Sequence, residues 1–406
     1  MVALLWLVYS SRSYLAESAR EAFLCGGPPG AYAKAPPRSK RSERETNSRR
    51  GNCRCVDDGD GQSSYDFCYR VGEASNATIG APFDCAWLPI LRSLALVGED
   101  ENQLVDLSRS GLPDPVFVTG CSGNHWAEAR QLIGNIERLF PKRRLILYDL
   151  GLSRRQREEL KIHPRVERRP FRYDRYPNYV GRLCEFRWKP IVQAEALREF
   201  GAIWYMDVSI VFERADLEPI HALLRCRRSN EKASLLRRLD DRDNSSGWNI
   251  SLTSDWRESL RRCDKAPYLL HSRLGHSTFA ATHPGMYTHL PPVNSTLLTT
   301  EPMFQSGFFL AVRTKDVWQD IIKWQVLCAL EKECMAPTGA ELACHFGKDP
   351  FAVYADCHRF DQSLVNLLLQ NRYGSHVRWS SGLDDFFKVA RLAAATLSLY
   401  GVDISV

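Results

Sequence analysis

Between Asp114 and Asp207, short runs of apolar residues alternate with longer stretches in which apolar residues recur every three or four positions. The short runs 115–119, 144–148, 166–171 and 202–206 predict buried strands, and 125–140 and 186–200 predict helices between them. Another helix is predicted after Ser153, where Gln156 stands at the capping-box position. Strands that alternate with helices through short connections predict an α/β fold, with a mostly parallel sheet and helices on both faces.

Beyond Asp207 the alternation is interrupted by a polar stretch. Residues 226–262 are rich in charged side chains and predict a polar insertion. Further along, 304–312 predicts a strand, and 316–330 and 361–370 predict helices. We assign 111–375 to one domain and 376–406 to a C-terminal tail.

The first 110 residues lack this regular pattern. Residues 24–66 contain a Gly/Pro cluster at 26–30 and a basic run at 38–50, a composition that does not bury a core. We therefore expect 24–110 to be a flexible stem with a short helix within 83–108. Residues 1–23 are interpreted as a truncated signal anchor, because the apolar run Val2–Tyr9 is much shorter than the roughly 20 residues that span a bilayer.

The composition narrows the class of protein only slightly. Hydrophobic residues make up 44% and charged residues 25%, values that exclude a wholly disordered or collagen-like chain. The net charge of +6 is mild for this length, and part of it lies in the run 38–50. The basic residues are not interleaved with aromatic ones, so we expect no nucleic-acid partner.

The cysteines and sequons point to the secretory pathway. Thirteen cysteines are dispersed without a C-x-x-C pair, a pattern that disfavours a zinc ribbon and favours disulfides formed in an oxidising compartment. The alternative is that most are buried free thiols; the odd count leaves at least one without an intrachain partner. N-glycosylation sequons begin at Asn76, Asn244, Asn249 and Asn294. We expect a glycoprotein of the Golgi or ER lumen, either a single-pass type II membrane protein or secreted.

Three loops follow predicted parallel strands, where ligands of such sheets bind. In the first, Thr119, Ser122 and Asn124 place hydroxyl and amide groups before a helix, which suits an anion or a nucleoside. In the second, Asp149 is placed to accept a hydrogen bond from a ribose hydroxyl. In the third, Asp207 is placed to hold a divalent cation against a diphosphate. For each loop, the alternative is a turn in which these groups bond only the nearby backbone.

Two further groups are candidates for ligand contact. In Arg187-Trp188-Lys189, we assign Arg187 to phosphates, Trp188 to the core and Lys189 to a solvated helix face. The histidines show no pair at ligand spacing. We select His283 as the candidate metal ligand, with His358 as the competing choice.

Six strings together resemble an uncharacterised animal family of type II membrane proteins, known only as a domain of unknown function. They are Val116–His125, Leu147–Leu152, Phe186–Pro190, Trp204–Ser209, Thr282–Tyr287 and Phe360–Ser363. That family in turn is similar to GT-A glycosyltransferases. The resemblance implies a GT-A-like (Rossmann-like) fold, a nucleotide-sugar donor such as a UDP-sugar, a glycan or glycoprotein acceptor, and Mn²⁺ or Mg²⁺ as cofactor.

The same resemblance implies roles for individual residues. Asp207 matches the first acid of the D-x-D metal motif, but Ser209 stands where the second acid would be. The Asp361-Gln362 pair matches residues at the active site of glycogenin-like retaining enzymes, so both are candidate catalytic residues. Physical chemistry alone also allows Asp361 to be an ordinary N-terminal helix residue that favours the helix dipole.

Three functional hypotheses follow. The first is a glycosyltransferase-like enzyme that uses the residues above. The second is a catalytically inactive binding or scaffold protein with the same fold, which Ser209 favours. The third is a methyltransferase-like enzyme with Asp149 on the ribose of its cofactor, which the missing glycine-rich loop disfavours.

Overall fold

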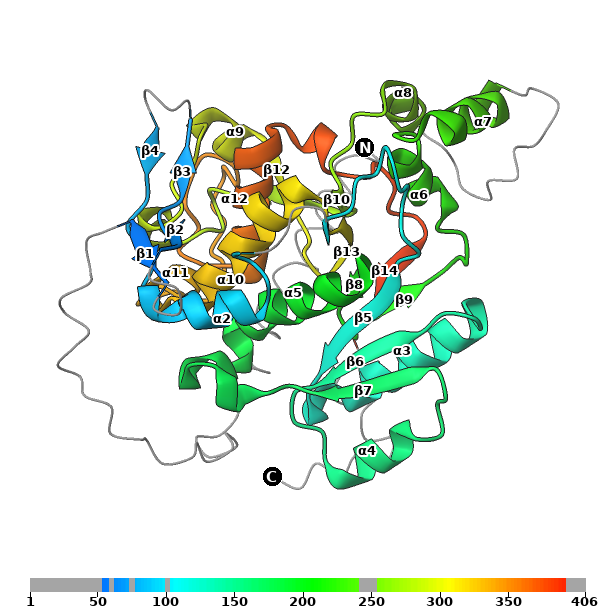
Figure 1. The fold of residues 1–406 in the computed structure, drawn as a ribbon, viewed down its shortest axis with the longest axis horizontal. Helices are drawn as coiled ribbons and strands as arrows, with labels where there is room; N and C mark the ends of the chain where they lie inside the picture. Colours follow the sequence, from blue (N-terminus) through cyan, green and yellow to red (C-terminus); the bar gives the residue numbers. More distant parts are fainter. Residues whose placement is uncertain (1–52, 58–61, 73–76, 99–102, 241–253, 392–406) are drawn as a thin grey trace.

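The computed structural model describes residues 53–57, 62–72, 77–98, 103–240 and 254–391 (Figure 1). The strands are β1 (Arg54–Val56), β2 (Ser64–Asp66), β3 (Arg70–Val71), β4 (Thr78–Ile79), β5 (Val116–Cys121), β6 (Leu145–Asp149), β7 (Val166–Pro170), β8 (Ala202–Met206), β9 (Ile210–Phe212), β10 (Tyr268–Leu270), β11 (Arg273–Ser277), β12 (Pro302–Phe304), β13 (Phe308–Val312) and β14 (Phe387–Val389). The helices are α2 (Leu88–Ser93), α3 (Trp126–Leu139), α4 (Arg154–Leu160), α5 (Trp188–Phe200), α6 (Glu218–Arg225), α7 (Ser229–Asp240), α8 (Ser254–Arg262), α9 (Ser295–Thr300), α10 (Lys323–Leu330), α11 (Lys332–Met335) and α12 (Asp361–Tyr373), with the π-helical turn η9 (Val317–Ile322) before α10.

A six-stranded sheet forms the centre of the molecule, in the order β10-β13-β8-β5-β6-β7. Strands β8, β5, β6 and β7 run parallel, while β13 is antiparallel to both β8 and β10. The predicted strands and helices between residues 115 and 206 are present, including the capping box of Ser153 and Gln156 on α4. The prediction of a mostly parallel α/β sheet is confirmed.

Helices cover both faces of this sheet (Figure 1). On β8, Ile203 and Tyr205 face the core that contains α5, α10 and α12, and Trp204 and Met206 face the core that contains α3, α4, α6 and α8. The strand is therefore apolar throughout, as expected for a strand buried on both faces. The position of β8 near the middle of the sheet brings its carboxyl end, and Asp207, between the two layers of helices.

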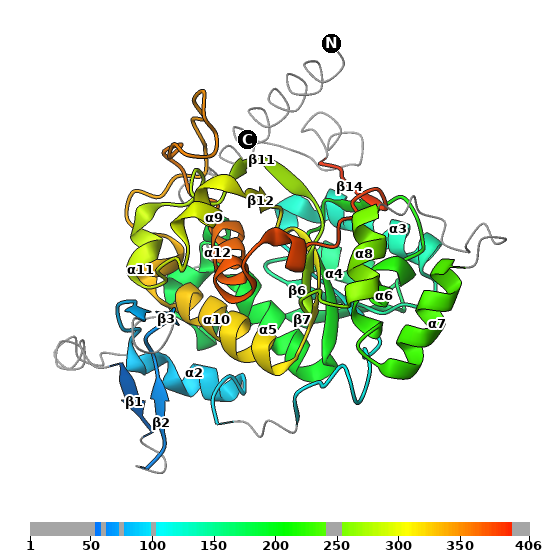
Figure 2. The ribbon, with the colours of Figure 1, turned by 90° about the horizontal axis from the view of Figure 1, so that it is seen from above.

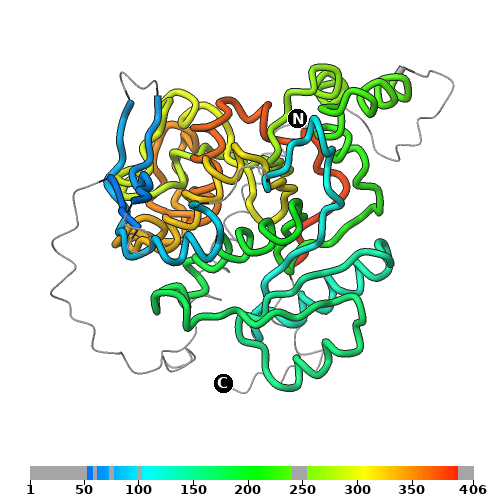
Figure 3. The backbone as a smooth tube through the Cα atoms, viewed as in Figure 1, coloured from blue at the N-terminus to red at the C-terminus, as the bar shows by residue number. Residues whose placement is uncertain are grey.

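The segment from Cys53 to about residue 98, predicted as part of a flexible stem, folds onto the α/β body (Figure 3). Disulfides Cys53–Cys68 and Cys55–Cys85 hold its short strands. The rings of Tyr69 and Phe83 lie 5.1 and 6.0 Å from the ring of Trp324 on α10. In this segment, disulfides supply part of the stabilisation that a hydrophobic core supplies elsewhere. Its composition therefore resembles that of a linker although the segment is folded.

The predicted polar insertion carries α7 and α8, and the disulfide Cys226–Cys263 closes it at its base. Figure 2 shows these helices on the side of the molecule away from β1 and β2. Residues 376–391, assigned to a tail, pack on the body: β14 pairs with β9, and Trp379 and Phe386 are fully buried. The sequons at Asn76, Asn244 and Asn249, the suggested anchor 1–23 and residues 392–406 lie outside the described residues.

The cysteines support the prediction of disulfides. Two more pairs, Cys328–Cys334 and Cys344–Cys357, join the three above, and Cys184 is also disulfide-bonded. Within the described part of the chain Cys121 is a free thiol, and it is buried. This set of disulfides fits folding in an oxidising compartment. Within the same described residues, no helix combines the length and the hydropathy needed to span a membrane.

Three buried histidines make the stability of this fold sensitive to acid. Burial lowers the pKa of His271 to about 3, of His276 to about 4 and of His358 to about 3. In the unfolded chain each ring takes up a proton below about pH 6.5. The unfolded state thus binds more protons than the folded state between roughly pH 6.5 and 4. The free energy of unfolding therefore decreases as the pH is lowered through that range.

We predict that the free energy of unfolding decreases between pH 7.5 and 5.5, with each of the three histidines contributing at most about 1.4 kcal/mol per pH unit. Urea unfolding followed by tryptophan fluorescence measures it. His271→Gln should give a shallower dependence, whereas His345→Gln should not alter it because His345 is exposed. Equal dependences in all three proteins would contradict this interpretation.

Candidate functional site

A pocket lies beyond the carboxyl end of β8, the position at which sheets of this type bind ligands. It is lined by Phe186, Lys189, Asp207, Ser209, Ile210, Leu274, Gln305, Ser306, Gly307, Leu342, Arg359, Asp361, Gln362, Val389 and Arg391. Most of its polar residues come from the loop after β8, the first turns of α5 and α12, and the loop before β13, and strands β9, β11 and β14 also contribute. Segments far apart in the sequence thus meet at one point on the sheet edge.

A buried ammonium group joins two carboxylates at the floor of this pocket. The Nζ of Lys189 lies 3.0 and 3.1 Å from the two carboxylate oxygens of Asp207 and 2.9 Å from Oδ2 of Asp361. Lys189 is 3% exposed and Asp361 is 9% exposed, while Asp207 is only partly buried. In such surroundings, a cation between two adjacent carboxylates offsets their mutual repulsion and the cost of burial.

Neighbouring groups hold both carboxylates in place. The Tyr205 hydroxyl donates to Oδ1 of Asp207 at 3.0 Å, and the Ser306 hydroxyl donates to Oδ2 of Asp361 at 2.8 Å. The amide of Asp207 donates to the carbonyl of Gly307 at 2.7 Å. A Cβ at position 307 would stand 2.8 Å from Oδ2 of Asp207, so this close approach requires glycine.

The charges of this cluster shift its pKa values in opposing ways. Burial tends to lower the pKa of Lys189, but the carboxylates of Asp207 and Asp361 outweigh it and raise the pKa above its ordinary value. Burial raises the pKa of Asp361, and the neighbouring charge of Asp207 adds to this, whereas Lys189 and Ser306 act against it. Lys189 is therefore charged at every physiological pH, and its charge opposes the rise that burial causes in the pKa of Asp361.

The backbone around the cluster is strained at two positions. Phe186 (φ 52°) precedes α5 and Phe360 (φ 44°) precedes α12, and both lie in a region that side chains other than glycine rarely adopt. The ring of Phe186 lies 5.1 Å from the ammonium of Lys189, and that of Tyr205 lies 5.7 Å from it. Strain of this kind persists where the surroundings demand it, often at functional sites.

The pocket as a whole suits an anionic ligand. Among its described lining residues, Lys189, Arg359 and Arg391 are cationic, against the two carboxylates. Gln305 and Gln362 add amide groups that can bond hydroxyls. Phosphate oxygens and sugar hydroxyls are the chemical groups that this combination binds.

The structure brings together three of the residues selected from the sequence. Asp207, Asp361 and Gln362 line the pocket. Thr119 lies within β5, Ser122 and Asn124 follow it, and none of the three lines the pocket. The hydroxyl of Thr119 is buried and has no hydrogen-bond partner, while that of Ser122 donates to Oδ1 of the exposed Asn124 at 2.5 Å.

Asp149, predicted to contact a ribose, is engaged by the chain itself. Its Oδ1 accepts hydrogen bonds from the amides of residues 151 and 152, at 3.0 and 2.7 Å. Its Oδ2 lies 3.0 Å from Arg157 and 2.9 Å from Arg168. The bonds of Oδ1 are those of a carboxylate that closes a turn, and Oδ2 is paired with two arginines; the contact with a ribose stays a prediction.

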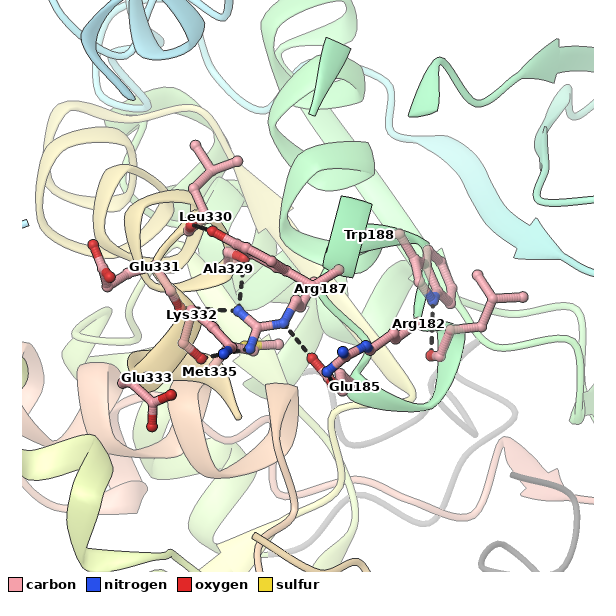
Figure 4. Close-up of polar contacts among 12 residues, drawn as sticks. Arg182, Glu185, Arg187, Trp188, Ala329, Leu330, Glu331, Lys332, Glu333 and Met335 are labelled. Atoms are coloured by element: carbon pink, nitrogen blue, oxygen red, sulfur yellow. Dashed lines mark hydrogen bonds and ion pairs between the residues drawn. The ribbon is translucent and has the colours of Figure 1, made fainter. Parts of the chain in front are cut away.

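Arg187, predicted to contact phosphates, is not among the residues that line the pocket and points toward the end of α10 and the start of α11 (Figure 4). It is 1% exposed, and its Nε donates to Glu185 at 2.5 Å. Its other nitrogens donate to the carbonyls of Ala329, Glu331 and Lys332 at 2.7–3.0 Å. The side chain therefore satisfies carbonyls at the end of a helix, which otherwise lack partners.

The pocket does not offer the ligand set of a protein-held metal ion. His283 lies outside its lining, and its Nδ1 accepts from the amide of Gly285 at 3.0 Å. His358 is buried, and its ring bonds the amide of His283 and the carbonyl of Met335. Across the described residues, the one group of three side chains spaced for a metal is Cys53, Asp66 and Cys68, two of which form a disulfide. At the pocket, Lys189 already neutralises the available carboxylates, so a resident divalent cation does not fit.

Sequence reasoning missed most of the polar residues of the pocket. Lys189 was assigned to a solvated helix face, which is wrong: it is buried, although its neighbour Trp188 lies in the core as predicted. Gln305 to Gly307 were read as part of one continuous strand, but they form the break between β12 and β13. A Ser-Gly pair inside an otherwise apolar strand pattern was the signal for a close backbone approach.

Residues 53–194 match the model of a family described as "Protein of unknown function (DUF1647)". The match bears out the resemblance to a family of unknown function for this part of the chain, and it begins within the segment that was predicted to be a stem. A search of curated proteins finds no match.

Several solved glycosyltransferase structures are similar to the chain. The galactosyltransferase LgtC, crystallised with donor and acceptor sugar analogues, shares 13% identity over 52% of this chain and 59% of its own, with a TM-score of 0.28. Mouse xyloside xylosyltransferase 1 shares 12% identity over 67% of this chain and 85% of its own, with a TM-score of 0.31. Core-mannan synthase A from Aspergillus fumigatus, in a Mn/GDP form, shares 10% identity over 71% of this chain and 83% of its own, with a TM-score of 0.31. At these identities and TM-scores, the activities of those proteins cannot be assigned to this chain.

We predict that Arg187→Met destabilises the protein by roughly 3–5 kcal/mol, because it removes a buried cation and leaves three carbonyls and Oε2 of the partly buried Glu185 without their donor. Arg182→Met is the matched control: Arg182 pairs with the same Glu185, at 3.1 Å, but is largely exposed, so its loss should cost less than about 1 kcal/mol. Chemical unfolding measures both. Similar costs for the two variants would contradict the structural role of Arg187.

We predict that Gly307→Ala displaces the Asp207 carboxylate and costs about 1–3 kcal/mol of stability, since the new methyl group overlaps Oδ2. Gly275→Ala, in β11, is the control because a Cβ there meets nothing within 4 Å. The comparison is again made by chemical unfolding. If both alanines were equally tolerated, the close approach of Gly307 to Asp207 would be refuted.

Proposed function

We propose that this protein is a glycosyltransferase that binds a nucleotide sugar, a UDP-sugar by its sequence resemblance, in the pocket at the end of β8. The observation that carries the proposal is the buried cluster of Asp207, Lys189 and Asp361 in a pocket that also holds two arginines. A diphosphate and a polyhydroxylated sugar need, respectively, cations and a set of fixed acceptors and donors. The pocket provides both.

Each lining group has a role in this proposal. Arg359 and Arg391 contact the diphosphate. The nucleoside diphosphate is the leaving group, and it gains negative charge as its bond to the sugar breaks. Asp361 and Gln362, at the start of α12, face the transferred sugar and bond its hydroxyls. In its ionised form, paired with Lys189, Asp361 also stabilises positive charge that develops on the sugar ring. Asp207 is the more exposed carboxylate and binds sugar hydroxyls at the mouth of the pocket.

A non-catalytic binding protein is the second candidate. Ser209 lines the pocket where the D-x-D motif of the resembling enzymes has its second acid. A protein of this kind would bind the nucleotide sugar without releasing the nucleoside diphosphate. Binding and release are therefore measured separately.

The site of action in this proposal is the lumen of the Golgi or ER, as a type II membrane or secreted glycoprotein. The disulfides support an oxidising compartment. Of the four sequons, Asn294 lies in the described part of the chain, where it caps α9 and is exposed, so it is open to glycosylation. The acceptor in this proposal is a glycan or a glycoprotein.

We predict that a UDP-sugar stabilises the full-length protein by about 2.7 kcal/mol when present at 100 times its dissociation constant. Thermal unfolding against UDP-sugars, GDP-sugars and S-adenosylmethionine, each with Mn²⁺ and with EDTA, measures the effect. Asp207→Asn should reduce it, whereas Asp174→Asn should not, because Asp174 is exposed and outside the pocket.

The same samples are then assayed for release of UDP. Release by the wild-type protein that Asp361→Asn abolishes supports a transferase, and binding without release supports the non-catalytic protein. If no nucleotide sugar stabilises the folded wild-type protein in either buffer, the proposed function fails.

A further inference from the structure

The ammonium of Lys189 occupies the position in which a divalent cation would join the two carboxylates of the pocket. It contacts Asp207, which follows the central strand β8, and Asp361, which opens α12, at 2.9–3.1 Å. These are the two acids of the pocket lining. A magnesium, manganese or calcium ion would need the same oxygens at roughly 2.0–2.6 Å. The lysine and the metal ion therefore exclude one another.

The lysine is fixed in this position from several sides. Its side chain leaves the first turn of α5 and is 4% exposed, with the rings of Phe186 and Tyr205 packed near the ammonium. Ser306 and Tyr205 bond the two carboxylates that face it. Removing the ammonium to admit a metal would break this whole set of contacts and leave a lysine to be accommodated elsewhere.

We propose that Lys189 replaces the divalent cation, so that the pocket binds its phosphate-bearing ligand without a metal. The charge of the diphosphate is then met by Arg359 and Arg391 from the pocket wall, with Lys189 holding the acids neutralised beneath it. Ser209 fits this arrangement, since a site without a metal does not need a second acid at that position. The part of this proposal that concerns the ligand rests on the proposed function; the part that concerns the metal does not.

The first experiment tests the metal alone, on the full-length protein without nucleotide. The concentration of free Mn²⁺ is followed by its EPR signal. The wild-type protein should leave the signal unchanged. Lys189→Met, which removes the charge at nearly constant length, should bind Mn²⁺ roughly tenfold or more tightly than wild type, because two carboxylates are left without a cation.

Two variants serve as controls for this titration. Lys189→Arg keeps the positive charge and should behave as wild type, and Lys142→Met removes an exposed lysine outside the pocket. Gain of Mn²⁺ binding in Lys189→Met alone supports the proposal. Mn²⁺ binding by the wild-type protein that Asp207→Asn abolishes overturns it, as does a folded Lys189→Met variant that binds no more Mn²⁺ than wild type.

The second experiment uses the wild-type protein only, so it does not depend on a variant that folds. Stabilisation by the UDP-sugar is compared in EDTA and in Mn²⁺. Equal shifts support metal-independent binding, and a shift that needs Mn²⁺ overturns it. Absence of any shift in both buffers is the failure of the proposed function, and the EPR titration then decides the role of Lys189 by itself.

Discussion

The structure depends on one buried ammonium group, that of Lys189, which neutralises the buried Asp361 and the partly buried Asp207. Asp207 and Asp361 come from positions 154 residues apart in the chain, and the ammonium of Lys189 lies within 3.1 Å of both. A buried carboxylate without a partner is costly, and removal of one member of such a group costs several kcal/mol. The cluster thereby fixes the end of β8 against the first turns of α5 and α12.

The rest of the fold gives this cluster its place. Parallel strands direct their carboxyl ends, and the loops that follow, toward one edge of the sheet. The antiparallel strand β13 then brings Gly307 from the opposite direction, opposite Asp207. Because glycine has no side chain, the Asp207 carboxylate fits against position 307, and the preceding Ser306 donates to Asp361. The site is thus made where the parallel and the antiparallel parts of the sheet meet.

The sequence was most informative where structure is local. The strands and helices between 115 and 206 repeat with clear periods, and the capping box at Ser153 is a contact between neighbours in the chain. Asp207 could be selected because it follows a central strand. Lys189 could not be selected, because its role comes from burial between Asp207 and Asp361. Both acids lie far from it in the sequence, so the pattern of its own helix does not indicate the contact.

Two other differences have the same origin. Arg187 was expected to meet phosphates, but its partners are carbonyls more than 140 residues away, which no local pattern reveals. The segment after Cys53 was expected to be a stem, but its order depends on disulfides and on a contact with Trp324. Long-range pairing decided these cases, and composition and periodicity do not record it.

The most direct test of this account is a crystal structure of the full-length protein, from crystals soaked with a UDP-sugar in the presence of EDTA. The account predicts electron density for the diphosphate beside Arg359 and Arg391, with the sugar at Asp361 and Gln362 and Lys189 still between the two acids. Density for the nucleotide at another place would contradict it. So would a diphosphate that is absent in EDTA but present in a matched soak with Mn²⁺, with the metal ion in place of Lys189 at Asp207.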